Sequence, residues 1–273
     1  MAILKAIMIG DIVGEPGLAV LESCLPALKH DTGADFVVVN GENAADGFGM
    51  TAESLKRILD AGADAVTSGN HVWEKKEFWP ALEAERRMLR PANYPAGTPG
   101  RGWYREDREG VSWVVISLQG REFMPAIDCP FRSFDAVLES LGGSVSPAPS
   151  VILVDFHAES SREKEALAYY LDGRAGLVAG THTHVQTADE RLLPRGTAYI
   201  TDLGMTGVSG GIIGMDPKIC LDRARTQILY RMEVAKASDS QPPVIKGVLA
   251  EIDKDTGRAL SIARLSVPGK HPV

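Results

Sequence analysis

The sequence predicts an α/β protein, and two observations in the N-terminal third carry the prediction. Three short apolar runs, at 3–9, 36–39 and 63–67, each stop at polar residues, and stretches with helical periodicity separate them. Such alternation is typical of βαβ units. The chain has 273 residues, of which 44% are hydrophobic and 24% charged, so it has an ordinary globular composition and can bury a large core.

Two helices are expected between these strands. Pro16 suits the first turn of a helix that runs to about Lys29. Thr51 is a suitable N-cap for a second helix over 52–61, because its hydroxyl can accept a hydrogen bond from a free amide of the first turn. In open α/β sheets, ligands bind beyond the carboxyl ends of the strands, so a crevice is expected where the three strands end.

The remaining chain predicts more strands and one more helix. Weak patterning over 80–110 indicates a loop-rich connection, and 120–150 reads as an irregular insertion with short helical pieces, Gly142-Gly143, Pro147 and Pro149. A helix is expected over 161–171, and strands over 111–118, 151–154, 176–179, 197–200, 228–234, 244–253 and 259–265. The last three alternate apolar and polar residues, as antiparallel strands of a second sheet would.

The glycine-rich segment 207–214 resembles a phosphate-binding loop only superficially. It lacks both a preceding strand and the Lys-Ser/Thr pair of a P-loop, so a flexible loop near the crevice is the better interpretation.

Charge and targeting signals restrict the partners. The net charge of -7 argues against binding of duplex nucleic acid, but not against a small phosphorylated ligand. The three cysteines, Cys24, Cys129 and Cys220, are widely spaced and read as reduced thiols. We find no signal peptide and no apolar stretch of membrane-spanning length, which favours a cytoplasmic location. Without repeats or low-complexity linkers, residues 1–273 are expected to form a single domain.

Polar side chains gather where the predicted strands end. Four of the six histidines lie there, whereas His30 is in a polar helix end and His271 in the C-terminal tail. The candidate site residues are Asp11, Glu42, Asn43, Asn70, His71, His157, His182 and His184. Clustered histidines and carboxylates indicate a metal or catalytic site.

The ligand types narrow the choice of metal. Imidazole, carboxylate and amide oxygen without thiolate suit iron, manganese or zinc. The candidates outnumber what one catalytic ion needs, and two ions that share a carboxylate would use them all. Such a pair can activate a water for attack at phosphorus.

Six motifs carry a resemblance to a known family. They occur in order as GDIVG (10–14), NGENAADGFG (40–49), GNHVW (69–73), DFHAE (155–159), GTHTHVQTADE (180–190) and TDLGMTG (201–207). Together they resemble the calcineurin-like metallophosphoesterases, specifically the bacterial branch of YmdB phosphodiesterases. The resemblance implies a metallophosphoesterase fold, a four-layer α-β-β-α sandwich with two mixed sheets.

The resemblance also implies how the ligands are shared. Glu42 would bridge two ions, with Asp11, Asn43 and His184 completing one and Asn70, His157 and His182 the other. The wider superfamily opens with Asp-x-His, but this chain has Val13 at the histidine position, a departure that the YmdB branch shares. Asn43 could supply an oxygen in its place, or only orient Glu42. His182 and His184, two apart on an extended segment, would point the same way.

His71 has a separate implied role. It would be the general acid that protonates the leaving oxygen, and a fifth-ligand role is the alternative. Four acidic residues near the tips are candidate hydrogen-bond acceptors for the ligand imidazoles, or else ordinary loop residues: Asp155, Asp189, Glu190 and Asp202. Phe48 and Trp73 could contact substrate, although ordinary packing is the better interpretation of each one.

The implied activity is a metal-dependent phosphoric diester hydrolase. Attack by metal-activated water on small phosphodiesters, particularly 2′,3′-cyclic nucleotides, is the expected reaction, and a homo-oligomer is compatible with it. A hydrolase of amides or phosphomonoesters is one alternative, since the same ions can polarise a carbonyl. The other is a regulatory protein that binds metal or nucleotide and hydrolyses weakly.

Overall fold

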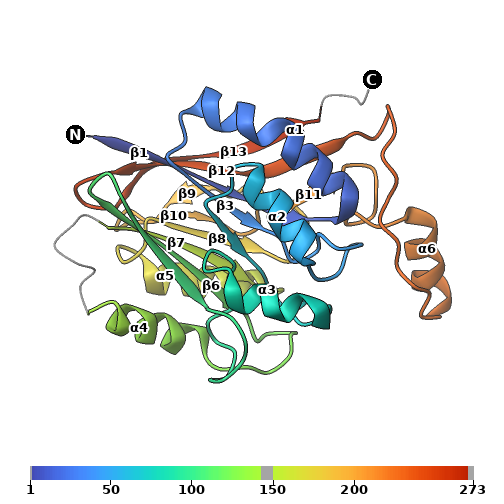
Figure 1. The fold of residues 1–273 in the computed structure, drawn as a ribbon, viewed down its shortest axis with the longest axis horizontal. Helices are drawn as coiled ribbons and strands as arrows, with labels where there is room; N and C mark the ends of the chain where they lie inside the picture. The colour runs from blue at the N-terminus through green and yellow to red at the C-terminus, as the bar shows by residue number, and fades with distance from the viewer. Residues whose placement is uncertain (1, 143–149, 270–273) are drawn as a thin grey trace.

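Two stacked β-sheets with helices on both outer faces form the protein, as a computed structural model of residues 2–142 and 150–269 shows (Figure 1). The first sheet has the strand order β2-β11-β12-β1-β3-β4, and β13 pairs with β12. Its strands are β1 (Ile3–Ile9), β2 (Asp11–Ile12), β3 (Phe36–Asn40), β4 (Ala65–Thr67), β11 (Met205–Val208), β12 (Pro243–Asp253) and β13 (Ala259–Pro268).

The second sheet has the order β5-β6-β7-β8-β10-β9, with a parallel centre and an antiparallel strand at each edge. Its strands are β5 (Trp103–Arg108), β6 (Val111–Gln119), β7 (Ser150–His157), β8 (Leu177–Thr181), β9 (Arg191–Leu192) and β10 (Ala198–Ile200). The helices are α1 (Gly14–Thr32), α2 (Ala52–Asp60), α3 (Trp79–Ala84), α4 (Pro130–Ser140), α5 (Ser161–Leu171), α6 (Pro217–Thr226) and the 3-10 helix η1 (Lys76–Phe78).

Alternation along the strands creates the layers. In β1, Ile7 and Ile9 belong to the apolar cluster under α1 and α2, whereas Ala6 and Met8 face the second sheet. Phe36 stacks on Trp113 across the two sheets, with ring centroids 4.9 Å apart. A third cluster packs α4 and α5 on the outer face of the second sheet. The expected four-layer α-β-β-α sandwich with two mixed sheets is therefore confirmed.

Several local predictions were wrong. The strands at 244–253 and 259–265 exist as β12 and β13, but they belong to the first sheet. The reason is that the whole of β1 pairs with β12, from Ile3↔Asp253 to Ile9↔Gly247. Residues 228–234 are not a strand and form only a bridge from Val234 to Met215. Alternation reveals a half-buried strand, but it identifies neither its partner nor whether a partner exists.

Segments that were predicted to be loops or irregular insertions contain regular secondary structure. The stretch 80–110 holds most of α3 and the edge strand β5, and the segment 207–214 begins inside β11. The insertion 120–150 contains one regular helix, α4, while Gly143, Pro147 and Pro149 lie outside the described residues. Thr51 caps α2 as predicted, and Ser54 completes the capping box. Helix α1 begins at Gly14, two residues before Pro16.

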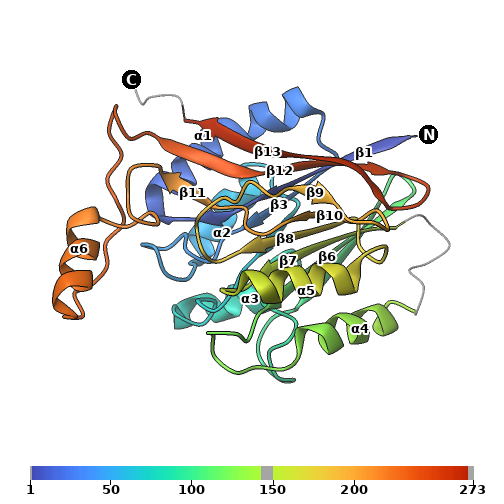
Figure 2. The same cartoon turned by 180° about the vertical axis from the view of Figure 1, so that it is seen from behind.

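Helix α6 stands apart from both sheets in the two opposite views (Figures 1 and 2). None of its residues is buried. No helix within residues 2–142 and 150–269 is long and apolar enough to cross a membrane.

Candidate metal centre

The ends of five strands, drawn from both sheets, bring the candidate residues together. Asp11 lies two residues past the end of β1, as the first residue of β2. The pair Glu42 and Asn43 follows β3, and Asn70 follows β4. In the second sheet, β7 ends on His157, and His182 and His184 follow β8. Asp11, Glu42, Asn43 and His157 are buried, and Asn70, His71, His182 and His184 are half-buried. The crevice that the sequence predicts for one sheet is thus shared between two.

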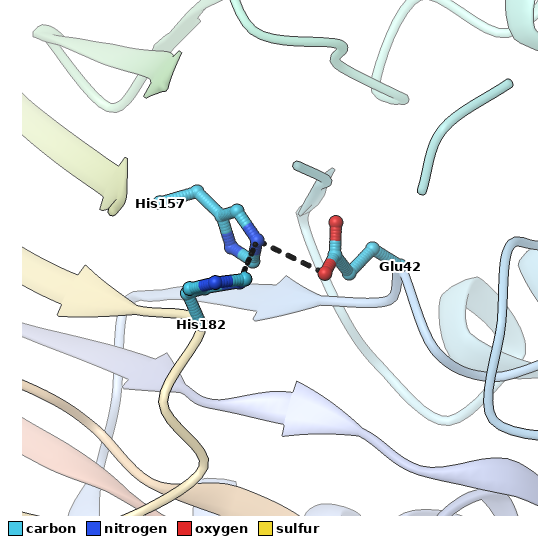
Figure 3. Close-up of side chains that lie close together, drawn as sticks. All are labelled: Glu42, His157 and His182. Atoms are coloured by element: carbon cyan, nitrogen blue, oxygen red, sulfur yellow. Dashed lines mark hydrogen bonds and ion pairs between the residues drawn. The ribbon is translucent and has the colours of Figure 1, made fainter. Parts of the chain in front are cut away.

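The Nε2 atom of His157 is the point on which the site converges (Figure 3). It lies 3.0 Å from Glu42 Oε1, 2.9 Å from Asn70 Oδ1 and 3.0 Å from His182 Nδ1. A ring nitrogen carries either one hydrogen or one lone pair, so it cannot satisfy three such neighbours. The ligand atoms of Glu42, His157 and His182 all lie within 4.8 Å of one another, a spacing suitable for shared coordination of a cation.

Asp11 gives a second test of whether a metal fits. Its Oδ1 is buried and has no hydrogen-bond partner among the residues that the structure describes. It lies 3.8 Å from His157 Nδ1. Burying a carboxylate oxygen without a partner is costly, and a bound cation removes that cost. The donor set and this unpaired oxygen therefore both fit a metal centre.

A chain of hydrogen bonds orients His157. Thr181 Oγ1 donates to Asp155 Oδ1 over 2.7 Å, and it lies 2.9 Å from His157 Nδ1. Because the hydroxyl hydrogen is already used, the threonine oxygen is left to accept from an Nδ1–H. That tautomer leaves the Nε2 lone pair free to face the centre. Asp155 also accepts hydrogen bonds from Asn40 and Thr67. Every residue of this hydrogen-bond network is buried.

In each of the other two histidines, too, one ring nitrogen contacts a group that fixes the orientation of the ring. His182 turns Nδ1 toward His157, while its Nε2 lies 3.2 Å from the Glu159 carboxylate. His184 places Nδ1 2.8 Å from the Ile213 carbonyl, and its Nε2 lies 3.0 Å from Asn43 Nδ2. Each imidazole therefore uses one nitrogen for positioning and turns the other toward a neighbouring site residue.

Burial and neighbouring charges shift the pKa values of the four most central groups in different directions. Burial raises the pKa of Asp11 to about 6, although His184 and His157 oppose the shift. For Glu42, burial acts to raise the pKa, but His157 overcomes it and lowers the pKa to about 2. Burial lowers the pKa of His157, but Glu42 and Asp11 reverse this and raise it to about 9. Burial and neighbouring His157 lower the pKa of His182 to about 3. The opposite shifts of Glu42 and His157 follow from their direct contact at 3.0 Å.

The segment 182–184 is not extended, which makes that part of the prediction wrong. His182 has φ 100° and His184 has φ 65°. Asp202 shapes the turn by accepting from the backbone amide and the hydroxyl of Thr183, at 3.1 and 2.8 Å. The buried Lys164 ammonium donates to the same carboxylate over 2.7 Å. Tertiary contacts, rather than strand geometry, thus aim the two histidines.

Gly69 allows the loops to approach. A Cβ atom here would lie 2.1 Å from His157 Cδ2 and 2.4 Å from Glu42 Oε2. The neighbouring His71 donates its backbone amide to Glu42 Oε2 over 3.3 Å. Its Nδ1 lies 3.1 Å from Glu74 Oε1, and Phe48 contacts its ring edge-to-face. His71 is consequently held beside the cluster.

The remaining predicted residues are more distant in role. Asp155 reaches an imidazole only through Thr181, and Asp189 binds Thr201 and Arg191. Glu190 binds Arg264 and Asp202 binds Lys164. None of these four carboxylates is hydrogen-bonded directly to a site histidine in the described part of the chain. Trp73 packs against Trp79 and Tyr94.

Two polar residues were missed by sequence reasoning. Thr181 and Glu159 contact His157 and His182 directly. The available signal was their position next to predicted ligands in the motifs at 180–190 and 155–159.

Comparisons with known proteins agree with this architecture. A 2′,3′-cyclic-nucleotide 2′-phosphodiesterase of Bacillus subtilis (strain 168) is 42% identical over 268 residues, covering 98% of both chains. A crystal structure of a hypothetical protein from Thermus thermophilus superposes with TM-score 0.89 at 39% identity, covering 98% of this chain and 100% of that one. A phosphatase from Mycoplasma pneumoniae also has TM-score 0.89, at 28% identity, with 100% and 96% coverage. The family model described as YmdB-like protein matches residues 7–265. The chain therefore belongs to the YmdB-like protein family.

Proposed function

We propose that this protein is a dinuclear metal-dependent phosphodiesterase that hydrolyses small phosphodiesters, with 2′,3′-cyclic nucleotides as the preferred substrates. The convergence of Glu42, Asn70 and His182 on one nitrogen of His157 carries the proposal. The similarity to the Bacillus phosphodiesterase supports the substrate class. Because the site draws on both sheets, we also propose that residues 1–273 act as one domain.

The proposed ligand allocation places Glu42 between two ions, preferably iron or manganese. Asp11, Asn43 and His184 would hold one ion, and Asn70, His157 and His182 the other. Ions held there would supply Lewis-acid chemistry by activating water and neutralising charge that develops on the phosphoryl oxygens. Asn43 lies beside both Glu42 and His184, which is compatible with its coordinating or its orienting role.

His71 is the proposed general acid. Its Nδ1 contacts Glu74, so Nε2 is the nitrogen available to give a proton to the leaving alkoxide. Its backbone amide holds it next to Glu42, and the edge-to-face Phe48 ring restricts the imidazole. Neither contact requires His71 to bind metal.

The test uses two substrates with different leaving groups. His71→Ala should lower turnover of 2′,3′-cAMP by roughly 10²- to 10⁴-fold, the usual contribution of a general acid. Bis-p-nitrophenyl phosphate should lose much less, because p-nitrophenolate leaves without a proton. His30→Ala is the matched control, since His30 is exposed at the end of α1. Equal losses on both substrates, with metal content retained by elemental analysis, would rule out the acid role.

A substrate panel separates the remaining alternatives. Phosphodiesters should be hydrolysed faster than phosphomonoesters and amides at equal metal content. For a regulatory role with incidental hydrolysis, the inactive but metal-loaded His71→Ala variant should keep its cellular effect. Loss of that effect together with activity supports catalysis as the function.

A further inference from the structure

A basic surface hollow lies outside the metal centre. It has a volume of about 900 Å³ and borders β5, the end of α4 and the segment that follows α3. Its charged and aromatic lining includes Arg86, Arg90, Arg101, Arg105, Trp103 and Asp107. Four arginines thus face one carboxylate in a chain whose net charge is -7. No candidate metal ligand lines the hollow.

Arg90 is the residue that makes this hollow unusual. Only 9% of its surface is exposed. Its guanidinium donates hydrogen bonds to the carbonyls of Pro99, at 3.1 Å, and Pro91, at 2.8 Å. It donates to no carboxylate within the described chain. Burial accordingly lowers the pKa of Arg90. The charge of Glu83 partly opposes this shift, but Glu83 forms no ion pair with Arg90 within the described chain, so an anion in the hollow would further offset the cost of burying the guanidinium.

Two half-buried arginines elsewhere in the protein are neutralised by carboxylates. Arg57 pairs with Glu15 and Glu22, and Arg174 pairs with Asp135. In the hollow, the exposed side chains of Arg86 and Arg101 have no hydrogen-bond or ion-pair partner among residues 2–142 and 150–269. Three guanidinium groups therefore remain available to an anion.

The size and lining indicate the ligand class. A volume of about 900 Å³ exceeds what inorganic phosphate fills and suits a small organic ligand. Guanidinium forks match phosphate oxygens, and several forks favour more than one phosphate. Trp103 and Tyr104 line the same hollow and offer apolar surface to a base.

The hollow is separated from the metal centre along the sheet. Gln119 at the end of β6 pairs with His157, whereas Arg105 of β5 pairs with Val114, five residues earlier on β6. At ~3.3 Å per residue this places Arg105 roughly 17 Å back from the site along the strand. The other end of the hollow is closer to the site, because Gly102 accepts a hydrogen bond from the amide of Ser117, two residues before Gln119. The two sites therefore differ in their lining residues rather than by a large distance.

We infer that this hollow is a second, non-catalytic site that binds a nucleoside diphosphate-like anion, with Arg86, Arg90 and Arg101 on the phosphates and Trp103 beside the base. The inference does not depend on the reaction at the metal centre. A nucleic-acid strand is disfavoured because the negative net charge opposes a long phosphate backbone.

Calorimetric titration of the metal-loaded protein with ADP tests the inference. We expect one ADP per chain in the hollow, and Arg86→Ala/Arg101→Ala should weaken its binding about tenfold or more by removing two charged contacts. Both residues are exposed, so the variant should fold. Arg132→Ala, an exposed arginine of α4 that does not line the hollow, is the charge-matched control and should bind normally.

Glu42→Gln distinguishes the hollow from the metal centre. ADP binding that persists in this variant supports the second site, whether or not hydrolysis is lost. Loss of binding in Glu42→Gln would place ADP at the metal centre and overturn the inference. Three other results would also overturn the inference. The first is equal affinity for ADP and inorganic phosphate, and the second is binding of single-stranded RNA but not of ADP. The third is normal ADP binding by arginine variants that only have a lower melting temperature. The last result would mean that the arginines serve the C-terminal carbonyls of α4.

Discussion

Single polar contacts decide which nitrogen each site histidine presents. His157 is oriented by Thr181, His182 by Glu159 and His184 by the Ile213 carbonyl. Metal ligands need such partners, because an imidazole that can rotate or change tautomer binds more weakly. Glu159 and Thr181 are therefore positioning residues in the proposed centre.

Thr181→Val tests this positioning. The valine has nearly the same shape but cannot accept from His157 Nδ1 or donate to Asp155, so metal affinity should fall about 10- to 100-fold. Competition titration with a chelating dye measures the change. Thr181→Ser keeps the hydroxyl and should restore most of the affinity. A valine variant with unchanged affinity would show that the hydroxyl does not position His157.

At the scale of elements, the site depends on how strand ends and loops are fixed. The loop after β8 is bent by Asp202, which Lys164 of α5 neutralises at the protein interior. The loop after β4 approaches the other sheet only because Gly69 has no side chain. Helix and loop contacts therefore set the positions of groups that do the proposed chemistry.

Gly69→Ala should disrupt the centre through space alone. Its Cβ would lie 2.1 Å from His157 Cδ2, so either the β4 loop or the imidazole must move, and metal should be lost. Gly97→Ala is the control: nothing lies within 4 Å of its added Cβ. Its φ of 88° makes alanine unfavourable by about 1 kcal/mol, without effect on metal. Elemental analysis of both proteins makes the comparison, and normal metal content in Gly69→Ala would contradict it.

Lys164→Met should destabilise the fold by leaving Asp202 buried without its cation. The expected loss is about 3–5 kcal/mol in the free energy of unfolding. Lys218→Met removes an exposed ion pair with Asp222 and should cost less than about 0.5 kcal/mol. Urea denaturation of both variants provides the measurement. Similar small changes would mean that other contacts of Asp202 compensate.

At the scale of the whole molecule, the packing of two sheets creates the site. Asp11, Glu42 and Asn70 come from the first sheet, and His157 and His182 from the second. The apolar cluster between the sheets, including the Phe36–Trp113 stack, holds these groups in register.

Trp113→Ala tests that coupling. Removing a buried tryptophan should lower the free energy of unfolding by about 3–5 kcal/mol. Metal affinity should fall as well, because the sheets that carry the ligands lose a shared contact. Leu229→Ala, at a side chain that is 85% exposed, should change stability by less than about 0.5 kcal/mol. Chemical denaturation and metal titration report the two effects separately, and a stable Trp113→Ala protein would contradict the prediction.

The sequence alone determined the strands of the N-terminal third, the N-cap at Thr51 and the polar residues at five strand ends. These features follow from local signals, since strand periodicity, capping chemistry and chain order need no knowledge of distant contacts. The same locality explains the errors: alternation at 244–253 could not identify β1 as the partner of β12, and alternation at 228–234 occurred without a strand.

Only the tertiary structure decided the remaining features. The left-handed conformations of His182 and His184 and the orienting contacts of Thr181 and Glu159 depend on segments far apart in sequence. Hydrogen bonds and packing across the two sheets fix each of them. The sequence could name the groups that meet, but long-range packing determined their geometry.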